Sequence, residues 1–262
     1  MFKPKEKYKV AYHYTGLEGF LGITESRSFW LTNAYYLNDK NEIKWPIEMA
    51  IRHFNADPDN NKELIKYLSY LKSNIFDIYL ISFTYNKNLL SQWRAYTNKG
   101  NGVSIGIEMS KLETIANDNG LHLINVIYDN DKHIDIIEML KREFIARVHN
   151  NVIPYAELNN IFLSQLVRIK SREFQEEEEV RLVSDYFEKY TDSRIKYKSK
   201  PNLLIPYIEI GFKKYANPVF EEIIVGPCQH FELNWKSIQN RLSATGLCNL
   251  TASSQSSFRS FE

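Results

Sequence analysis

The chain has 262 residues, of which 44% are hydrophobic and 25% charged, so it can bury a substantial core as one large domain or two small ones. Its 33 Lys and Arg residues nearly balance its 32 Asp and Glu residues, so no global field points to nucleic acid or to an anionic membrane, and only a local patch could do so. Two cysteines, Cys228 and Cys248, are too few and too poorly clustered for a disulfide framework or a zinc site, and they favour a reducing cytoplasm.

The chain carries no signal for a membrane or for export. The lysine-rich start, Met1 to Lys9, is followed by polar and aromatic residues in place of the apolar core of a signal peptide. No apolar run approaches the roughly 20 residues of a membrane span. We therefore expect a cytoplasmic protein with no membrane partner. Its aromatic content of 14% is unusual, and such residues fill cores or build stacking surfaces for flat ligands.

The first part of the chain alternates strands with helices. Runs of β-prone residues predict strands over 8–14, 29–32, 78–85 and 103–108, and apolar residues at helical spacing predict helices over 17–23, 43–54, 59–73 and 89–96. Thr15 and Glu18 have the spacing of a capping box before the first of these helices. Thr15 thus has two interpretations: it caps the helix, or together with His13 it lines a site at the end of the first strand.

The middle of the chain is helical, and the last third returns to sheet. Helices are expected from Ser110 to Gly120, from Asp131 to Val148 and from Pro154 to Ile169, with a strand over 122–128 between the first two. Strands are then expected over 179–183, 194–198, 204–212 and 221–225, before a helix over 231–244 and a short strand over 248–252. No repeat or linker divides the chain, so we expect one domain over 1–262 with a loosely held tail over 253–262.

Four consecutive carboxylates, Glu176 to Glu179, run directly into a β-prone segment. A side chain at the mouth of a strand can point into a cleft while its neighbours face water, so Glu179 is our candidate for a working carboxylate. Glu177 and Gln175 would share its face two and four residues earlier. The alternative is that the four glutamates form a solvent-exposed turn without a functional role, because blocks of like charge are usually exposed.

Three aromatic residues are candidates for a stacking surface. Trp93 and Tyr96 lie three positions apart on one face of the predicted 89–96 helix, and Tyr85 precedes Tyr96 by eleven positions. They either stack on a flat ligand or cover the sheet as core residues.

Seven landmarks in this order resemble the bacterial domain-of-unknown-function family 2971. They are Tyr12–Thr15, Leu37–Asp39 with Glu42, Ile81–Phe83, Trp93–Tyr96, Gly102–Ile107, Glu177–Leu182 and Glu222–Pro227. The resemblance covers nearly the whole chain. It departs from the family pattern at Val180, where an aromatic residue is expected, and at Tyr85, where the residue is often acidic.

A second resemblance is to the His-Tyr-Glu pattern of diphtheria-toxin-like and poly(ADP-ribose) polymerase-like ADP-ribosyltransferases. Here it is carried by His13 with Thr15, by Tyr85 with Tyr96, and by Glu179. It implies an α+β fold, an ADP-ribosyltransferase-like split β-sheet with helical insertions. It also implies NAD as a substrate and no metal. The departure at Tyr85 makes Tyr96 and Trp93 the stronger candidates for stacking.

The same resemblance implies a role for each candidate residue. Glu179 would stabilise the oxocarbenium ion that forms as nicotinamide leaves, and Glu177 or Gln175 would face the acceptor. His13 and Thr15 would hold the adenosine ribose, and the aromatic residues would stack on nicotinamide. Such bacterial enzymes are often toxins or phage-defence effectors, so the expected partners are a macromolecular acceptor, with RNA or DNA as candidates, and an antitoxin or chaperone. The alternatives are an NAD glycohydrolase and a non-catalytic nucleotide-binding or sensing module.

Overall fold

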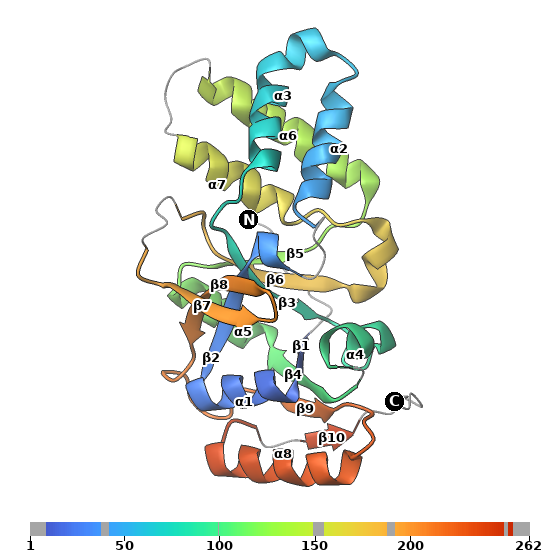
Figure 1. Cartoon of the computed structure of the whole chain (residues 1–262), viewed down its shortest axis with the longest axis vertical. Helices are drawn as coiled ribbons and strands as arrows, with labels where there is room; N and C mark the ends of the chain where they lie inside the picture. The colour runs from blue at the N-terminus through green and yellow to red at the C-terminus, as the bar shows by residue number, and fades with distance from the viewer. Residues whose placement is uncertain are drawn as a thin grey trace.

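The computed structural model describes residues 9–37, 42–98, 100–148, 155–187 and 192–248, and the backbone of 251–253. The predicted tail lies outside these residues except for the backbone of Ser253, and Asn38 and Asp39 of the family pattern also lie outside them. The fold is mixed α/β, with a largely antiparallel sheet and helices (Figure 1).

Nearly every predicted element is found close to its expected position. The strands are β1 (Val10–Gly16), β2 (Ser28–Asn33), β3 (Tyr79–Thr84), β4 (Gly102–Glu108), β5 (His122–Asn125), β6 (Glu179–Val183), β7 (Ile195–Lys200), β8 (Leu203–Gly211), β9 (Glu222–Val225) and β10 (Thr251–Ser253). The helices are α1 (Leu17–Ser26), α2 (Lys44–Phe54), α3 (Pro58–Ser73), α4 (Leu90–Tyr96), α5 (Met109–Asp118), α6 (Asn130–Val148), α7 (Tyr155–Leu166) and α8 (Phe231–Thr245), with 3-10 helices η1 (Ala34–Tyr36) and η2 (Arg172–Glu177).

Among the described residues, ten strands form one sheet, with the order β10-β9-β4-β1-β3-β2-β8-β7 and with β6 and β5 branching from β3. The described pairs are antiparallel except β9 with β10, which are parallel. The strand β3 lies at the branch point. Its pairing with β6 joins Leu80 to Val183 at one end and Thr84 to Glu179 at the other.

The other edge of β3 is open in its middle. There β1 pairs with β3 only at Tyr12 with Thr84, and β2 pairs with it only at Thr32 with Leu80 and Asn33 with Tyr79. No described strand pairs with this edge between those two points. The sheet therefore parts between β1 and β2, beside residues 81–83.

Two hydrophobic cores cover the two faces of the sheet. One core contains residues of α2, α3, α6 and α7 together with Leu80 and Val183, and these helices gather above the sheet in Figure 1. The other contains residues of α1, α5 and α8 together with Val180 and Leu182. Because side chains alternate along a strand, Glu179 and Arg181 on β6 share the face of Val183, toward the helical layer of α2, α3, α6 and α7.

Candidate functional site

A cavity of about 860 Å³ lies at the opening in the sheet. Its lining includes five of the residues singled out in the sequence: His13, Thr15, Tyr96, Glu177 and Glu179. They come from β1, from α4, from the end of η2 and from the start of β6. The volume is within the range of roughly 300–1,000 Å³ that is usual for small-molecule sites.

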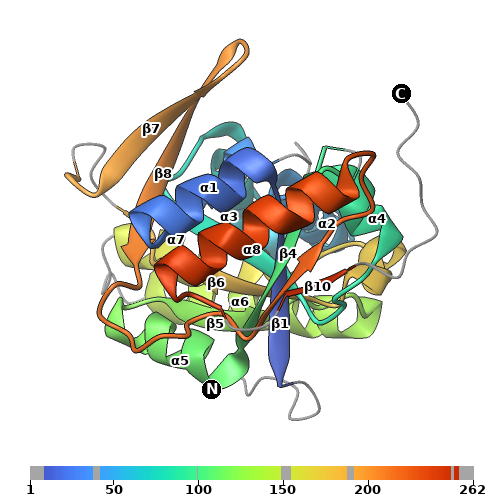
Figure 2. The ribbon, with the colours of Figure 1, turned by 90° about the horizontal axis from the view of Figure 1, so that it is seen from below.

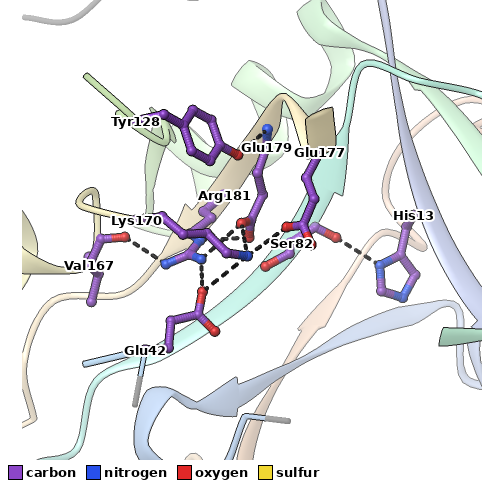
Figure 3. A network of polar contacts seen from close by, with 9 residues as sticks. All are labelled: His13, Glu42, Ser82, Tyr128, Val167, Lys170, Glu177, Glu179 and Arg181. Carbon is purple, nitrogen blue, oxygen red and sulfur yellow. Dashed lines mark hydrogen bonds and ion pairs between the residues drawn. The ribbon is translucent and has the colours of Figure 1, made fainter. Parts of the chain in front are cut away.

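A buried cluster of charges forms one wall of this cavity (Figure 3). Both oxygens of Glu179 accept from Arg181, Oε1 from Nε at 2.7 Å and Oε2 from the terminal guanidinium nitrogen at 2.9 Å. Oε2 of Glu179 also accepts from Nζ of Lys170 at 3.0 Å, and Glu177 accepts from the same Nζ at 2.6 Å. Arg181 further donates to the carbonyl of Val167 at 2.7 Å.

Glu42, just before α2, completes the cluster. It accepts a hydrogen bond from Arg181, and its Oε1 lies 3.7 Å from Nζ of Lys170. Three carboxylates, those of Glu42, Glu177 and Glu179, thus face two cations. When all five groups are ionised, the cluster carries one net negative charge at the cavity wall.

The residue between Glu177 and Glu179 turns the chain. Glu178 has a left-handed backbone conformation with φ of 39°, and it ends η2 where β6 begins. Such a conformation is uncommon for a residue other than glycine. Because of this turn, Glu177 on a helix and Glu179 on a strand reach the same ammonium group. The glutamate run therefore comprises the end of a short helix, a turn and the first residue of β6, Glu179, which is buried at 5% exposure.

The electrostatics of the cluster follow from burial and charge pairing. Burial raises the pKa of Glu179, while the charge of Lys170 and a hydrogen bond from Ser82 oppose that rise. Burial lowers the pKa of Lys170, but the charges of Glu179 and Glu177 outweigh it, so the pKa of Lys170 is raised overall. Burial lowers the pKa of Arg181 to about 9, which leaves its guanidinium charged at neutral pH.

His13 borders the same cavity from the opposite side of β3. Its Nδ1 lies 3.0 Å from the carbonyl of Ser82, within the open edge of the strand (Figure 3). A carbonyl only accepts, so Nδ1 carries the proton and Nε2 is an acceptor in the neutral ring. Burial lowers the pKa of His13, which favours this neutral form. Ser82 therefore contacts both His13 and Glu179.

Thr15 does not cap α1, and the predicted capping box is wrong. The N-cap residue is Gly16, and no side chain accepts a hydrogen bond there. The hydroxyl of Thr15 lies against Gly19, where an added Cβ would come within 2.0 Å of Oγ1. Thr15, Gly16 and Gly19 all line the cavity, so the first turn of α1 presents its backbone on that side. Of the two interpretations of Thr15, the structure therefore agrees with the second, in which Thr15 and His13 line the same cavity.

The three aromatic candidates are separated. Tyr96 is 39% exposed and lines the cavity, near enough to Lys170 to affect its pKa. Trp93 is fully buried in a small core with Tyr14, and its Nε1 donates to Asn88. Tyr85 is also buried and donates to Asn125 at 2.8 Å.

Neither Trp93 nor Tyr85 is part of the cavity lining, and both occupy the core positions that were the alternative interpretation. Gln175 is exposed on η2 and does not line the cavity either. Of the two partners expected for Glu179, only Glu177 therefore lies beside it.

Lys170 was not singled out in the sequence, and Glu42 and Arg181 appeared there only within the family landmarks, without a place in the candidate site. Arg181 carried a signal, because an arginine between Val180 and Leu182 in an apolar strand is buried and must find a buried partner. Glu42 lies 139 positions from Arg181, and no local pattern connects them.

Two further observations concern metals and membranes. Within the described ranges, no group of three or more His, Cys, Asp or Glu side chains is arranged to hold a metal ion. Of the helices that the structure describes, none combines the length and apolar character that crossing a bilayer requires.

The fold and the cavity define a mixed α/β protein with a buried, charge-paired carboxylate site at an opening in its sheet. Residues 92–182 match the family model described as "Protein of unknown function (DUF2971)". This match runs from α4 into β6 and includes Glu177, Glu179 and Arg181, and it supports the family that the sequence landmarks predict. No match was found among curated proteins or among solved structures.

Proposed function

We propose that the protein is an NAD-dependent ADP-ribosyltransferase that uses this cavity to bind NAD and transfers ADP-ribose to a macromolecule. The observation that carries the proposal is the gathering of Glu177, Glu179, His13, Thr15 and Tyr96 around one cavity. They include a carboxylate pair, a hydroxyl, an imidazole acceptor and an exposed aromatic ring. In this proposal the chain adopts an ADP-ribosyltransferase-like split sheet, and a role as a toxin or defence effector belongs to the same proposal.

The chemistry needs negative charge where the bond breaks. Cleavage of the bond between nicotinamide and ribose develops positive charge on the sugar, as in glycoside hydrolysis. A fixed carboxylate in a water-poor wall stabilises that charge better than it stabilises the ground state. Glu179, held by Arg181 and Lys170, is fixed in this way, and the cluster keeps one net negative charge. Of the two cations in the cluster, Glu177 contacts Lys170, and in this proposal it is the carboxylate that faces the acceptor.

The remaining residues orient the dinucleotide. Nε2 of neutral His13 accepts from a ribose hydroxyl, and Thr15 offers a second polar contact on the same strand. Tyr96 stacks on nicotinamide, since an aromatic ring holds a flat ligand at little cost in rotamer freedom. Because Tyr85 and Trp93 lie in the core, they have no part in this binding mode.

A second candidate is a non-catalytic nucleotide-binding module. One observation favours it: both oxygens of Glu179 are already occupied by Arg181 and Lys170. In that case the ion cluster holds the helical layer to the sheet, and the cavity binds a nucleotide without cleaving it.

The test is release of nicotinamide from labelled NAD by the purified protein. Release with transfer of label to a macromolecule supports the transferase, release without transfer supports the glycohydrolase, and NAD binding without release supports the binding module. Replacing Glu177 or Glu179 with glutamine should lower the rate on the order of 10²-fold or more if that carboxylate acts on transition-state charge. Glu176→Gln is the matched control, because Glu176 belongs to the same run but is exposed and outside the cavity lining.

Folding must be measured alongside the rate, because Glu179→Gln also unbalances the buried charges. Rates are therefore compared at a temperature where circular dichroism shows each variant folded. Tyr96→Ala supplies an independent readout: loss of stacking should weaken NAD binding several-fold with little change in melting, since the ring is part-exposed. Unchanged NAD binding in this variant, with unchanged rates in both glutamine variants, would remove the proposal.

A further inference from the structure

A β-hairpin projects beside the cavity. It consists of β7 and β8, which pair from Ile195 with Ile208 to Lys200 with Leu203, and it extends beyond the body of the molecule in Figure 2. β7 is the last strand of the sheet order, and no strand that the structure describes pairs with its outer edge. Lys198, Ser199, Lys200 and Ile205 of this hairpin line the cavity. The hairpin thus forms part of the cavity wall and continues outward from it.

The hairpin is basic although the whole chain is nearly neutral. From Ile195 to Gly211 it contains three lysines and one acidic residue, Glu209, against a formal charge of +1 for all 262 residues. Lys196, Lys198 and Lys200 occupy every second position of β7 and so share one face. Lys196 pairs with Glu209 on β8, and among the described residues no ion pair involves Lys198 or Lys200. The cavity wall therefore continues into a face with two unneutralised ammonium groups.

Stacked aromatic rings lie at the base of this face. Trp30 on β2 and Tyr207 on β8 have ring centroids 4.5 Å apart and planes inclined by 27°. Nζ of Lys198 lies 5.5 Å from the centre of the Trp30 ring and 5.6 Å from that of Tyr207. Trp30 is 38% exposed and lines the cavity. An exposed indole beside lysines is the combination that proteins use to hold an unpaired base and its phosphates.

We infer that this hairpin face and Trp30 receive the acceptor, and that the acceptor is single-stranded nucleic acid. The inference rests on the proposed transferase function. A base would stack on Trp30 while the phosphates on either side contact Lys198 and Lys200. Only an unpaired base can offer its face to the indole, so a duplex fits this surface less well. The nucleic-acid strand would then pass the wall of the cavity that carries Glu177.

The transfer step has a simple balance. A hydroxyl or amino group of the nucleic acid attacks C1′ of the nicotinamide ribose, forming the new glycosidic bond. The bond from C1′ to the nicotinamide nitrogen breaks, and its electron pair leaves with neutral nicotinamide. The proton of the acceptor passes to the carboxylate of Glu177 and then to water. No oxidant, reductant or metal is required.

The test is fluorescence anisotropy with labelled 20-nucleotide single-stranded RNA and DNA of mixed sequence, over a series of salt concentrations and without NAD. The variant replaces Lys196, Lys198 and Lys200 with glutamine. We expect at least tenfold weaker binding at moderate salt. The slope of log affinity against log salt should be smaller by about 1.4, since Lys198 and Lys200 each contact one phosphate and each single-strand phosphate contact contributes about 0.7. Trp30→Ala should weaken binding by about tenfold with an unchanged salt slope.

The matched control replaces Lys62, Lys66 and Lys72 of α3 with glutamine, which changes the net charge equally in the helical layer. It should bind as the unmodified protein does. The inference is overturned if the hairpin variant binds as tightly as this control, if duplex competes as well as single strand, or if only anionic phosphatidylserine vesicles bind, through exposed Leu203 and Leu204 at the hairpin tip. Melting curves show that each variant is folded.

Nicotinamide release separates this inference from the proposed function. If oligonucleotides bind through the hairpin but NAD is not cleaved, the transferase chemistry fails while the docking surface stands. If NAD is cleaved and label reaches protein but no nucleic acid, the docking surface fails while the chemistry stands.

Discussion

Replacing Arg181 with methionine would test whether the buried charges depend on one another. The Arg181 side chain is fully buried and makes four hydrogen bonds, two to Glu179, one to Val167 and one to Glu42. Methionine fills much of the same space but carries no charge. Three carboxylates would then face the single ammonium of Lys170, so the net charge of the cluster changes from −1 to −2.

The expected loss is large because the orphaned carboxylates stay buried. Removing one partner of a buried ion pair costs about 3–5 kcal/mol of unfolding free energy. For a protein of this size, 1 kcal/mol corresponds to about 2–4 °C in Tm. Arg181→Met should therefore melt roughly 6–20 °C below the unmodified protein. Thermal unfolding followed by circular dichroism measures this shift.

An exposed arginine provides the matched control. Arg194 also makes two side-chain bonds to one carboxylate, at 3.0 and 2.7 Å to Asp192, but its side chain is 63% exposed. Arg194→Met should cost less than about 1 kcal/mol, because water screens the pair. The double variant Arg181→Met with Glu179→Gln should melt at a higher temperature than Arg181→Met alone, since one unpaired buried charge is removed. Melting temperatures of Arg181→Met and Arg194→Met within about 2 °C of each other would show that the buried charges do not depend on Arg181.

Three further predictions follow from single residues. Glu178→Gly should leave the melting temperature unchanged or raise it, because glycine adopts the φ of 39° without strain, and a clear drop would show that the Glu178 side chain matters more than its backbone. Burial lowers the pKa of His13, so His13 binds a proton near pH 6.5 in the unfolded chain but only at lower pH in the native state. The unfolding free energy should therefore decrease as the pH falls below about 6.5. His13→Gln should flatten this fall between pH 7 and 5 in urea titrations, and an unchanged slope would contradict it. Tyr85→Phe should lower the unfolding free energy by about 1–2 kcal/mol, because the amide oxygen of Asn125 loses the hydrogen bond from Tyr85, while NAD binding stays unchanged. Weaker NAD binding in calorimetry would show that Tyr85 contributes to the NAD site.

Local pattern was enough to predict most of the elements. The β-prone run before Thr84 and the helical spacing of apolar residues up to Phe54 each predict an element that the structure confirms, because burial of one face dictates both patterns. Gly246 ends α8 in the left-handed conformation expected of a glycine at that position.

The order of the strands and the composition of the site could not be read in this way. That β3 lies between β1, β2 and β6 depends on contacts between distant segments, and so does the opening beside Ser82. Glu179 could be placed in the candidate site from the sequence because a carboxylate at the mouth of a strand is chemically unusual, and it lines the cavity. Its partners Arg181 and Lys170 lie only two and nine positions away, but spacing alone does not show which cation pairs with which carboxylate. Glu42 lies 139 positions from Arg181, where no local pattern connects the two residues. The aromatic spacing around Tyr96 suggested three stacking residues, but two of them serve the core.

The charge cluster also sets the earliest stage of synthesis at which this wall of the cavity can assemble. Glu42 and Arg181 are 139 positions apart, so the carboxylate wall is a contact of high sequence separation, of the kind that forms slowly during folding. On the ribosome, about two-thirds of the chain must emerge before the guanidinium that holds Glu179 is available. Fragments that end before β6 would lack both Glu179 and Arg181, so the carboxylate wall of the cavity cannot assemble in an incomplete chain of that length.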